Sequence, residues 1–173
     1  MHFSGILKKT IKPIKMKIQI GIADNHRQAI ADRLIKILAD ENVLYIKTKN
    51  AHWNVEGADY HDKRTFFDTQ CKQLDNIINS IAERIRSLGQ YVPATLQSYV
   101  SSTHFTEQNG ERHNSQAFIA ELLQDHESLI LRLCEYTMNC KDDLHDVATS
   151  HFITRLLEIH QKMAWPLRSY IIE

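Results

Sequence analysis

The sequence predicts an all-α fold: a bundle of four long helices with one long crossover between the second and the third. Glycine and proline are scarce, with 5 and 3 among 173 residues, which favours long uninterrupted helices. Apolar residues recur every three or four positions over four long segments, which is the period of a helix with one buried face. Between the second and third segments, residues 90–113 contain Pro93, Asn109-Gly110 and clustered Ser and Thr, which indicates a long connection.

The first two helices are expected over residues 25–53 and 59–88. Asn25 and Gln28 have the spacing of a capping box, which satisfies free amide groups at a helix start. Gly89 is the residue type that most often follows a helix end. The expected buried stripes are Ile30, Leu34, Ile37, Leu38, Leu44 and Tyr45 in the first helix, and Phe67, Leu74, Ile77, Ile78, Ile81 and Ile85 in the second. At about 1.5 Å per residue, each helix is roughly 45 Å long, so the two form a long hairpin.

The last two helices are expected over residues 115–139 and 146–172. Pro166 lies inside the fourth and should kink or terminate its last turn, because proline cannot donate a backbone hydrogen bond. The link over residues 90–113 is long enough to cross the bundle, and a short helix around residues 96–100 fits within it. Two helical hairpins joined by one long crossover form the ferritin-like four-helix bundle.

The chain is expected to divide into a flexible basic N-terminal arm, residues 1–22, and one helical domain, residues 23–173. The arm contains Lys8, Lys9, Lys12, Lys15 and Lys17. Met16 is an alternative start of the protein. The N-terminus lacks the apolar block of a signal peptide, and no apolar run reaches the roughly 20 residues of a membrane span, so we expect a cytoplasmic protein.

Composition and charge exclude several classes of protein. Hydrophobic residues make up 43% and charged residues 24%, as in a globular domain rather than a disordered chain. Lys and Arg total 21, equal to Asp and Glu, so any contact with nucleic acid must be local. Cys71, Cys134 and Cys140 are odd in number and lack metal-site spacing, which favours buried or idle thiols.

His52, Asp68 and Glu83 are the candidate metal ligands, because nitrogen and oxygen donors suit ferrous and ferric ions. His52 closes the first predicted helix, and the two carboxylates fall on the second. Asp68 and Glu83 are 15 positions apart, hence about 22 Å along the helix axis, too far to bind one metal in one chain. They can meet only if two copies of this helix pack antiparallel about a two-fold axis. A shared site therefore predicts a homodimer as the smallest functional unit.

Three separated motifs resemble those of one family. They are His-Trp-Asn-Val-Glu-Gly at residues 52–57, Ala-Glu-Arg-Ile-Arg-Ser-Leu-Gly at residues 82–89, and His-Gln-Lys-Met-Ala-Trp-Pro-Leu-Arg-Ser at residues 160–169. Together they resemble the Dps family of DNA-protecting miniferritins over residues 17–173. The resemblance implies a hollow homo-oligomeric shell of twelve subunits. It also implies that the shell oxidises ferrous iron, usually with hydrogen peroxide, and stores the mineral inside.

The resemblance also implies a ferroxidase site between subunits, built from five ligands. His52, Asp68 and Glu83 match three of them, whereas Arg64 replaces a His and Asn79 replaces an Asp. Arg64 cannot bind a metal because its guanidinium stays protonated, and Asn79 offers a neutral carbonyl in place of an anion. The spacing of Arg64 and Asp68 also predicts an ion pair between them.

Three states of this site are left open: a two-iron ferroxidase, a weaker one-metal site, and an inactive remnant. His61, one turn before Arg64, is a candidate substitute ligand. Without the family pattern, His52 would be interpreted as a packing residue and Asp68 as a surface carboxylate paired with Arg64. The two main hypotheses for function are an iron-handling miniferritin and a non-enzymatic cage or DNA-binding protein. A plain helical interaction bundle is the third.

Other charged residues have weaker assignments. Asp142, Asp143 and Asp146 precede the fourth helix, where the family places acidic pores for iron entry; the alternative is an acidic helix start favoured by the macrodipole. The lysine-rich arm resembles family arms that bind DNA without sequence preference; the alternative is a tail without that role. The remaining histidines, His104, His113, His126, His145 and His160, are interpreted as surface or satisfied residues.

Overall fold

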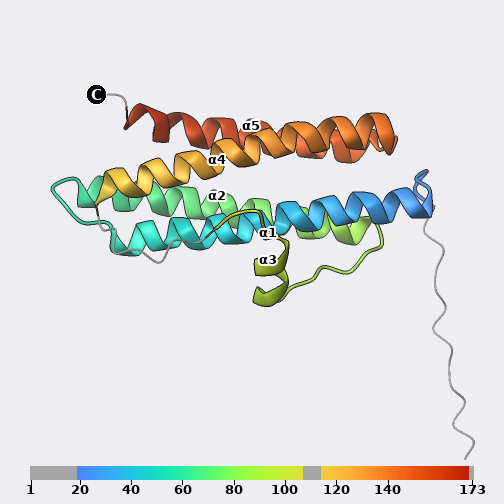
Figure 1. The fold of residues 1–173 in the computed structure, drawn as a ribbon, viewed down its shortest axis with the longest axis horizontal. Coiled ribbons are helices and arrows are strands. Elements are labelled where there is room, and N and C mark those ends of the chain that lie inside the picture. The colour runs from blue at the N-terminus through green and yellow to red at the C-terminus, as the bar shows by residue number, and fades with distance from the viewer. Residues whose placement is uncertain (1–18, 107–113, 172–173) are drawn as a thin grey trace, which may run out of the picture.

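The computed structural model describes residues 19–106 and 114–171 of the chain. The helices are α1 (Asp24–Asn54), α2 (Tyr60–Ser87), α3 (Leu96–Ser102), α4 (Ser115–Met138) and α5 (Val147–Ser169), with a π-helical turn, η1 (Asn139–Asp143), between the last two. Figure 1 shows α1 and α2 as one antiparallel hairpin, with the hairpin of α4 and α5 lying along it. The short helix α3 packs on the outside of α1.

This architecture confirms the predicted four-helix bundle and its crossover. The segment after α2 returns along the bundle and contains α3, at the place where a short helix was expected. The predicted basic arm falls mostly on residues 1–18, which lie outside the described residues, as does His113. None of the helices in the two described ranges is both long and apolar enough to cross a membrane.

The core lies where the four apolar stripes meet. Each long helix contributes side chains with almost no exposed surface, because its apolar positions repeat with the helical period. The ring of Phe67 in α2 meets that of Phe118 in α4 edge-on, with 6.5 Å between centroids. The most deeply buried of these side chains include Ile30, Leu34, Ile37, Leu38, Leu44, Phe67, Leu74, Ile81, Ile85, Ile119, Leu129, Leu133, Ile153 and Leu167.

One predicted helix cap is wrong, and one predicted helix end lies a few residues from the observed one. The capping box at Asn25 does not form, because α1 already begins at Asp24, after Ala23, and no side chain caps it. Asp24 instead accepts a hydrogen bond from the guanidinium of Arg27 at 2.7 Å. The fourth helix was expected to reach residue 172 with Pro166 kinking or ending its last turn; α5 continues past Pro166 and ends at Ser169. The loss of one backbone hydrogen bond is tolerated there because the neighbouring turns are anchored in the core, where Leu167 is fully buried.

A chain of three buried polar side chains connects three helices through the core. His160 of α5 contacts Glu41 of α1, with 2.8 Å between Nε2 and Oε1. The Nδ1 atoms of His160 and of His126 in α4 are 3.0 Å apart, so one ring donates a hydrogen bond to the other. Burial, and then the neighbouring His160, hold the pKa of His126 well below its ordinary value of 6.5. The interpretation of these histidines as satisfied residues is therefore confirmed, in the core rather than at the surface.

A second buried carboxylate anchors the crossover. Asp40 of α1 accepts hydrogen bonds from the Thr103 hydroxyl at 2.8 Å and from the backbone amide of His104 at 2.9 Å. The His104 ring lies between Asp40 and Ser128, with a nitrogen 2.9 Å from an oxygen of each. The segment that follows α3 is thus attached to both α1 and α4.

Two of the three cysteines agree with the expectation of buried thiols. Cys71 and Cys140 are buried and free, whereas Cys134 is exposed. Burial raises the pKa of Cys71 and of Cys140 to about 11, so both thiols stay protonated at neutral pH.

The free energy of unfolding is expected to fall when the pH is lowered from about 7.5 to about 5.5. In the unfolded chain His126 takes up a proton near its ordinary pKa of 6.5, whereas the folded core keeps it neutral. The loss therefore begins near that value and grows by up to about 1.4 kcal/mol for each further pH unit. Denaturant unfolding followed by circular dichroism at three pH values measures it.

The matched variants are His126→Gln, which removes the buried ring, and His151→Gln, which removes an exposed one. His126→Gln should lose much of the pH dependence and His151→Gln should keep it. An unchanged dependence in His126→Gln would assign the effect to other groups.

Candidate metal centre

The candidate centre forms where α1 ends and α2 begins. The amide of Val55 donates to the carbonyl of Ala51 at 3.0 Å and closes the last turn of α1. Gly57 has a φ of +119°, a backbone conformation that side-chain-bearing residues rarely adopt, and it allows the chain to reverse. Because the reversal is short, His52 near the end of α1 lies beside the first turns of α2.

His52 and Asp68 line the same surface pocket. The other lining residues are Tyr60, His61, Arg64 and Thr65. The Nδ1 atom of His52 is 3.0 Å from the carbonyl oxygen of Arg64, so the ring nitrogen donates its proton to that oxygen. This tautomer leaves a lone pair on Nε2, the arrangement that second-sphere hydrogen bonds impose on metal-binding histidines. The structure therefore brings together two of the predicted ligands and the candidate substitute, His61.

The predicted ion pair between Arg64 and Asp68 is wrong. Asp68 pairs instead with Lys72, with 2.6 Å between the oxygen and the ammonium nitrogen, and this hydrogen bond lowers the pKa of Asp68. An acidic residue four positions before a basic one is the more favourable order on a helix, which explains the choice of Lys72. The guanidinium of Arg64 donates to the hydroxyl of Tyr60 at 2.8 Å.

Glu83 and Asn79 lie on the exposed side of α2, towards its C-terminal end, away from this pocket. The side-chain amide of Asn79 donates to the backbone carbonyl of Asp75 at 3.0 Å. Across residues 19–106 and 114–171, no three His, Cys, Asp or Glu side chains of one chain are grouped as a metal site would require. One chain therefore supplies only part of the predicted ligand set.

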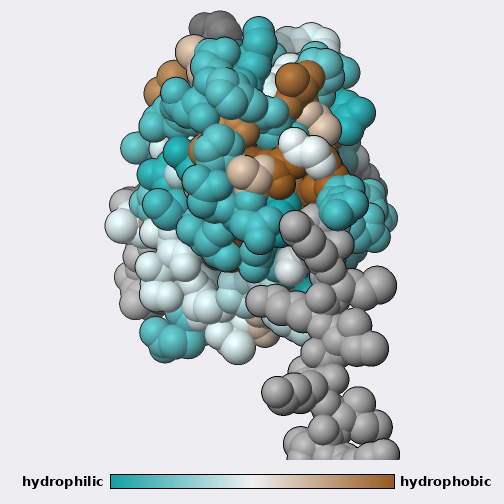
Figure 2. Space-filling model, turned by 90° about the vertical axis from the view of Figure 1, so that its right-hand side faces the viewer, coloured by the Kyte–Doolittle hydropathy of each residue, from teal (hydrophilic) through white to brown (hydrophobic). Residues whose placement is uncertain are grey.

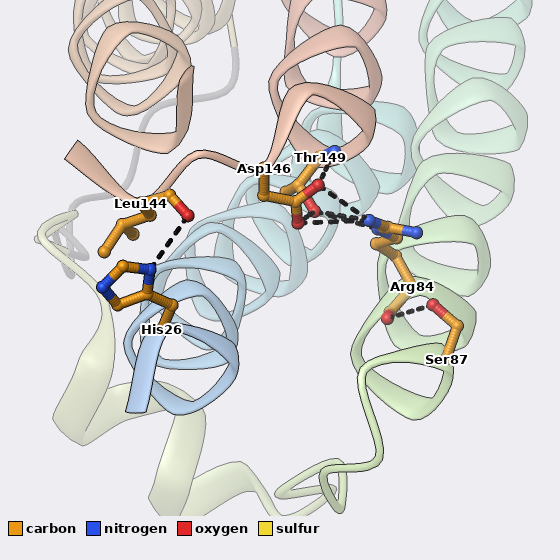
Figure 3. Close-up of polar contacts among 6 residues, drawn as sticks. All are labelled: His26, Arg84, Ser87, Leu144, Asp146 and Thr149. Carbon is orange, nitrogen blue, oxygen red and sulfur yellow. Dashed lines mark hydrogen bonds and ion pairs between the residues drawn. The ribbon is translucent and has the colours of Figure 1, made fainter. Parts of the chain in front are cut away.

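Asp146 has a structural role. It is the N-cap residue of α5, where its carboxylate accepts from the amide of Thr149 at 2.9 Å, and it is almost fully buried. Figure 3 shows Arg84 of α2 reaching the same carboxylate, at 3.2 Å, and the Thr149 hydroxyl, at 2.7 Å. The alternative interpretation, an acidic helix start, applies to Asp146, whose carboxylate is already engaged within the chain. Asp142 and Asp143 are exposed.

No pattern in the sequence indicated this connection, because Arg84 and Asp146 are far apart in the chain. At the same end of the bundle, just before α5 begins, the carbonyl of Leu144 is 3.2 Å from the ring of His26 in α1 (Figure 3). Figure 2 views the end of the bundle where α4 ends and α5 begins. This end is mostly hydrophilic, with hydrophobic residues on part of it. Arg84 adjoins Glu83, so this anchor also fixes the backbone that carries the third predicted ligand.

Comparisons with known proteins agree with this architecture. The family model described as a ferritin-like domain matches residues 31–173. An uncharacterized low temperature-induced protein of Nostoc sp. is 34% identical over 155 residues, which cover 90% of this chain and 87% of that protein. The DNA protection during starvation protein of Helicobacter pylori is 26% identical, over 77% of this chain and 92% of its own.

Solved structures show the same fold. DpsC from Streptomyces coelicolor superposes with a TM-score of 0.87 at 19% identity, covering 91% of this chain and 92% of DpsC. Antigen TpF1 from Treponema pallidum gives a TM-score of 0.82 at 24% identity, covering 91% and 100% of the two chains. The chain therefore belongs to the ferritin-like proteins and, among them, to the Dps family of miniferritins.

Replacing Asp146 by alanine is expected to lower the free energy of unfolding by about 1–3 kcal/mol. The change removes the cap of α5 and leaves the guanidinium of Arg84 without its carboxylate. Asp143→Ala makes the same change of charge at an exposed position and should stay within about 0.5 kcal/mol of the wild type. Denaturant unfolding of both variants measures the difference, and equal losses would contradict the role of Asp146 as an anchor.

Proposed function

We propose that this protein is an iron-handling miniferritin that oxidises ferrous iron and stores it inside a cytoplasmic shell of twelve identical subunits. Such a shell removes two reactants, ferrous iron and peroxide, that together damage DNA. The observation that carries the proposal is the shared pocket of His52 and Asp68, with the imidazole oriented by the carbonyl of Arg64. Glu83 of a second copy would complete the set of ligands.

The chemistry of these donors supports iron as the substrate. An imidazole nitrogen and carboxylate oxygens are ligands that both ferrous and ferric ions accept. The site favours one metal ion rather than two, because Arg64 and Asn79 supply neither an imidazole nor a carboxylate. Iron must also displace Lys72 from Asp68. The side chain of Lys72 is 75% exposed, so it can turn into solvent at little cost.

The relatives support the same proposal. The Helicobacter pylori relative is named for protecting DNA during starvation. The Dps protein of Vibrio cholerae, a member of the broad superfamily of ferritin-like diiron-carboxylate proteins, superposes with a TM-score of 0.84 at 21% identity. In this chain the residues of the centre differ from the family pattern, so the rate of oxidation is the quantity to measure.

Purified protein is expected to oxidise ferrous iron with hydrogen peroxide faster than buffer alone. His52→Ala and Glu83→Ala should each lower the rate by about tenfold or more, because each removes a metal ligand. Glu135→Ala removes an exposed carboxylate on α4 and should leave the rate unchanged. The double variant Arg64→His with Asn79→Asp restores the family ligands and should raise the rate. Stopped-flow absorbance of ferric iron measures all of these, and a wild-type rate equal to that of buffer would remove the proposal.

A second candidate function is a non-enzymatic cage that binds DNA. It is favoured by Arg64 and Asn79, which weaken the centre, and by the five lysines between residues 8 and 17. Positive charge repeated over the copies of a shell is sufficient to bind phosphates without sequence preference.

At low salt the full-length protein is expected to retard duplex DNA in a gel, and a variant lacking residues 1–16 should retard it much less. The retardation should weaken steeply as salt is raised, because binding releases counterions from the phosphates. Equal retardation by both proteins, or none by either, would exclude the arm as a DNA-binding element.

A further inference from the structure

A polar stripe runs along the outer side of α2. Its members recur at spacings of three or four and so lie on one face of the helix. All are exposed except Asp68, which is half-buried, while the opposite face of α2 is in the core. The α2 stripe consists of Arg64, Asp68, Lys72, Asp75, Asn79 and Glu83.

Several charges of the α2 stripe form no ion pair within residues 19–106 and 114–171 of their own chain. Among the described residues, Asp68 pairs with Lys72, whereas Arg64, Asp75 and Glu83 take part in no ion pair. Arg64 and Glu83 are 19 positions apart, which is about 28 Å along the axis, so they cannot meet within one chain.

The charges of the α2 stripe are complementary to those of a second α2 stripe that runs in the opposite direction. When two copies of α2 lie antiparallel about a two-fold axis, residues whose numbers have a constant sum face each other. In the register centred between Gln73 and Leu74, Arg64 faces Glu83 and Lys72 faces Asp75. In the same register Asp68 faces Asn79, whose amide can donate a hydrogen bond to a carboxylate.

A neighbouring register is much less favourable. A shift that places Asp68 directly opposite Glu83 sets two carboxylates against each other and leaves Arg64 opposite Ser87. Like charges in contact oppose association, whereas complementary charges fix the register of an interface. The order of charges along α2 therefore specifies a second copy of this chain as the partner.

We propose that, where two copies of α2 pack antiparallel as the shared centre requires, Arg64 forms an ion pair with Glu83 of the second copy. Because of the two-fold symmetry, this ion pair forms twice in each pair of subunits. The inference rests on the subunit arrangement of the proposed function and adds a regulation of its centre. The guanidinium holds the carboxylate that iron would need, as a fixed cation in place of the metal. Iron binding and the ion pair therefore compete for Glu83.

The test is a charge reversal in the full-length, metal-free protein. Arg64→Glu and Glu83→Arg each place like charges together, so each should raise the concentration at which the subunits dissociate by about tenfold or more. The double reversal recreates the pair in the opposite sense and should return this concentration to within about threefold of the wild type. Sedimentation over a dilution series measures it, with circular dichroism to verify that each variant is folded.

Arg86→Glu is the matched control. Arg86 is also exposed on α2, but its guanidinium donates to the carbonyl of Gln90 at 2.9 Å and stacks on the ring of Tyr91. Its reversal should change the dissociation much less than that of Arg64. If a reversal variant fails to fold, the neutral variants Arg64→Gln and Glu83→Gln are compared with their double variant. If the two residues form a pair, the change in dissociation of the double variant differs from the sum of the two single changes.

Two results would overturn the inference: additive losses in the double reversal, or an equal effect of Arg86→Glu. Iron oxidation is measured separately on the same proteins. A rescued double reversal together with no iron oxidation by the wild type would retain the ion pair and remove the ferroxidase. Normal oxidation without coupling between residues 64 and 83 would retain the ferroxidase and remove the ion pair.

Discussion

Burial of one face of α2 is the constraint on which the candidate centre depends. Phe67, Leu74, Ile81 and Ile85 are fully buried in the core. Because this face is held in the core, α2 cannot rotate about its axis. Its opposite face therefore points outward and carries Arg64, Asp68 and Glu83. Because the fixed face is also straight, the two carboxylates stay separated along the axis. The same packing that makes the bundle stable thus prevents one subunit from completing a metal site.

Charge competition decides what this outward face can bind. Asp68 is the only predicted carboxylate ligand in the pocket, and Lys72 already holds it. The two replaced positions remove one anion and add one cation. A divalent ion gains much less from such a site than from one with uncompensated carboxylates, because each neighbouring cation opposes its binding. Our two proposals are therefore linked through Glu83, whose partner is iron in one and Arg64 of a second copy in the other.

Buried polar groups give the bundle its specific arrangement. Asp40, Glu41 and Asp146 are almost fully buried carboxylates, and each bonds to groups from other elements. An apolar core tolerates sliding of one helix along another, whereas each of these groups loses its partners when the helices shift. Asp40 positions the crossover, Glu41 connects α1 to α5, and Asp146 connects α5 to α2. The register of the bundle is therefore maintained along its length.

Local patterns in the sequence were sufficient to predict the four helices and the crossover. These features depend on the helical period and on the scarcity of glycine and proline, which are properties of short segments. The resemblance added His52 and Asp68 as ligands of one site, and in the structure both line the same surface pocket. Local spacing was misleading for Asp68, since two basic residues lie four positions from it and only the order of charges distinguishes them.

Which polar residues are buried, and what they contact, was decided by the packing of the two hairpins. Arg84 with Asp146, His126 with His160, and Asp40 with the crossover are pairs between elements distant in the chain. No periodicity records such pairs, because each depends on how the hairpins lie against each other. Asp146 is an example. Its place in the sequence is compatible with a pore residue and with a helix start, and its contacts with Arg84 and Thr149 show that its carboxylate joins α5 to α2.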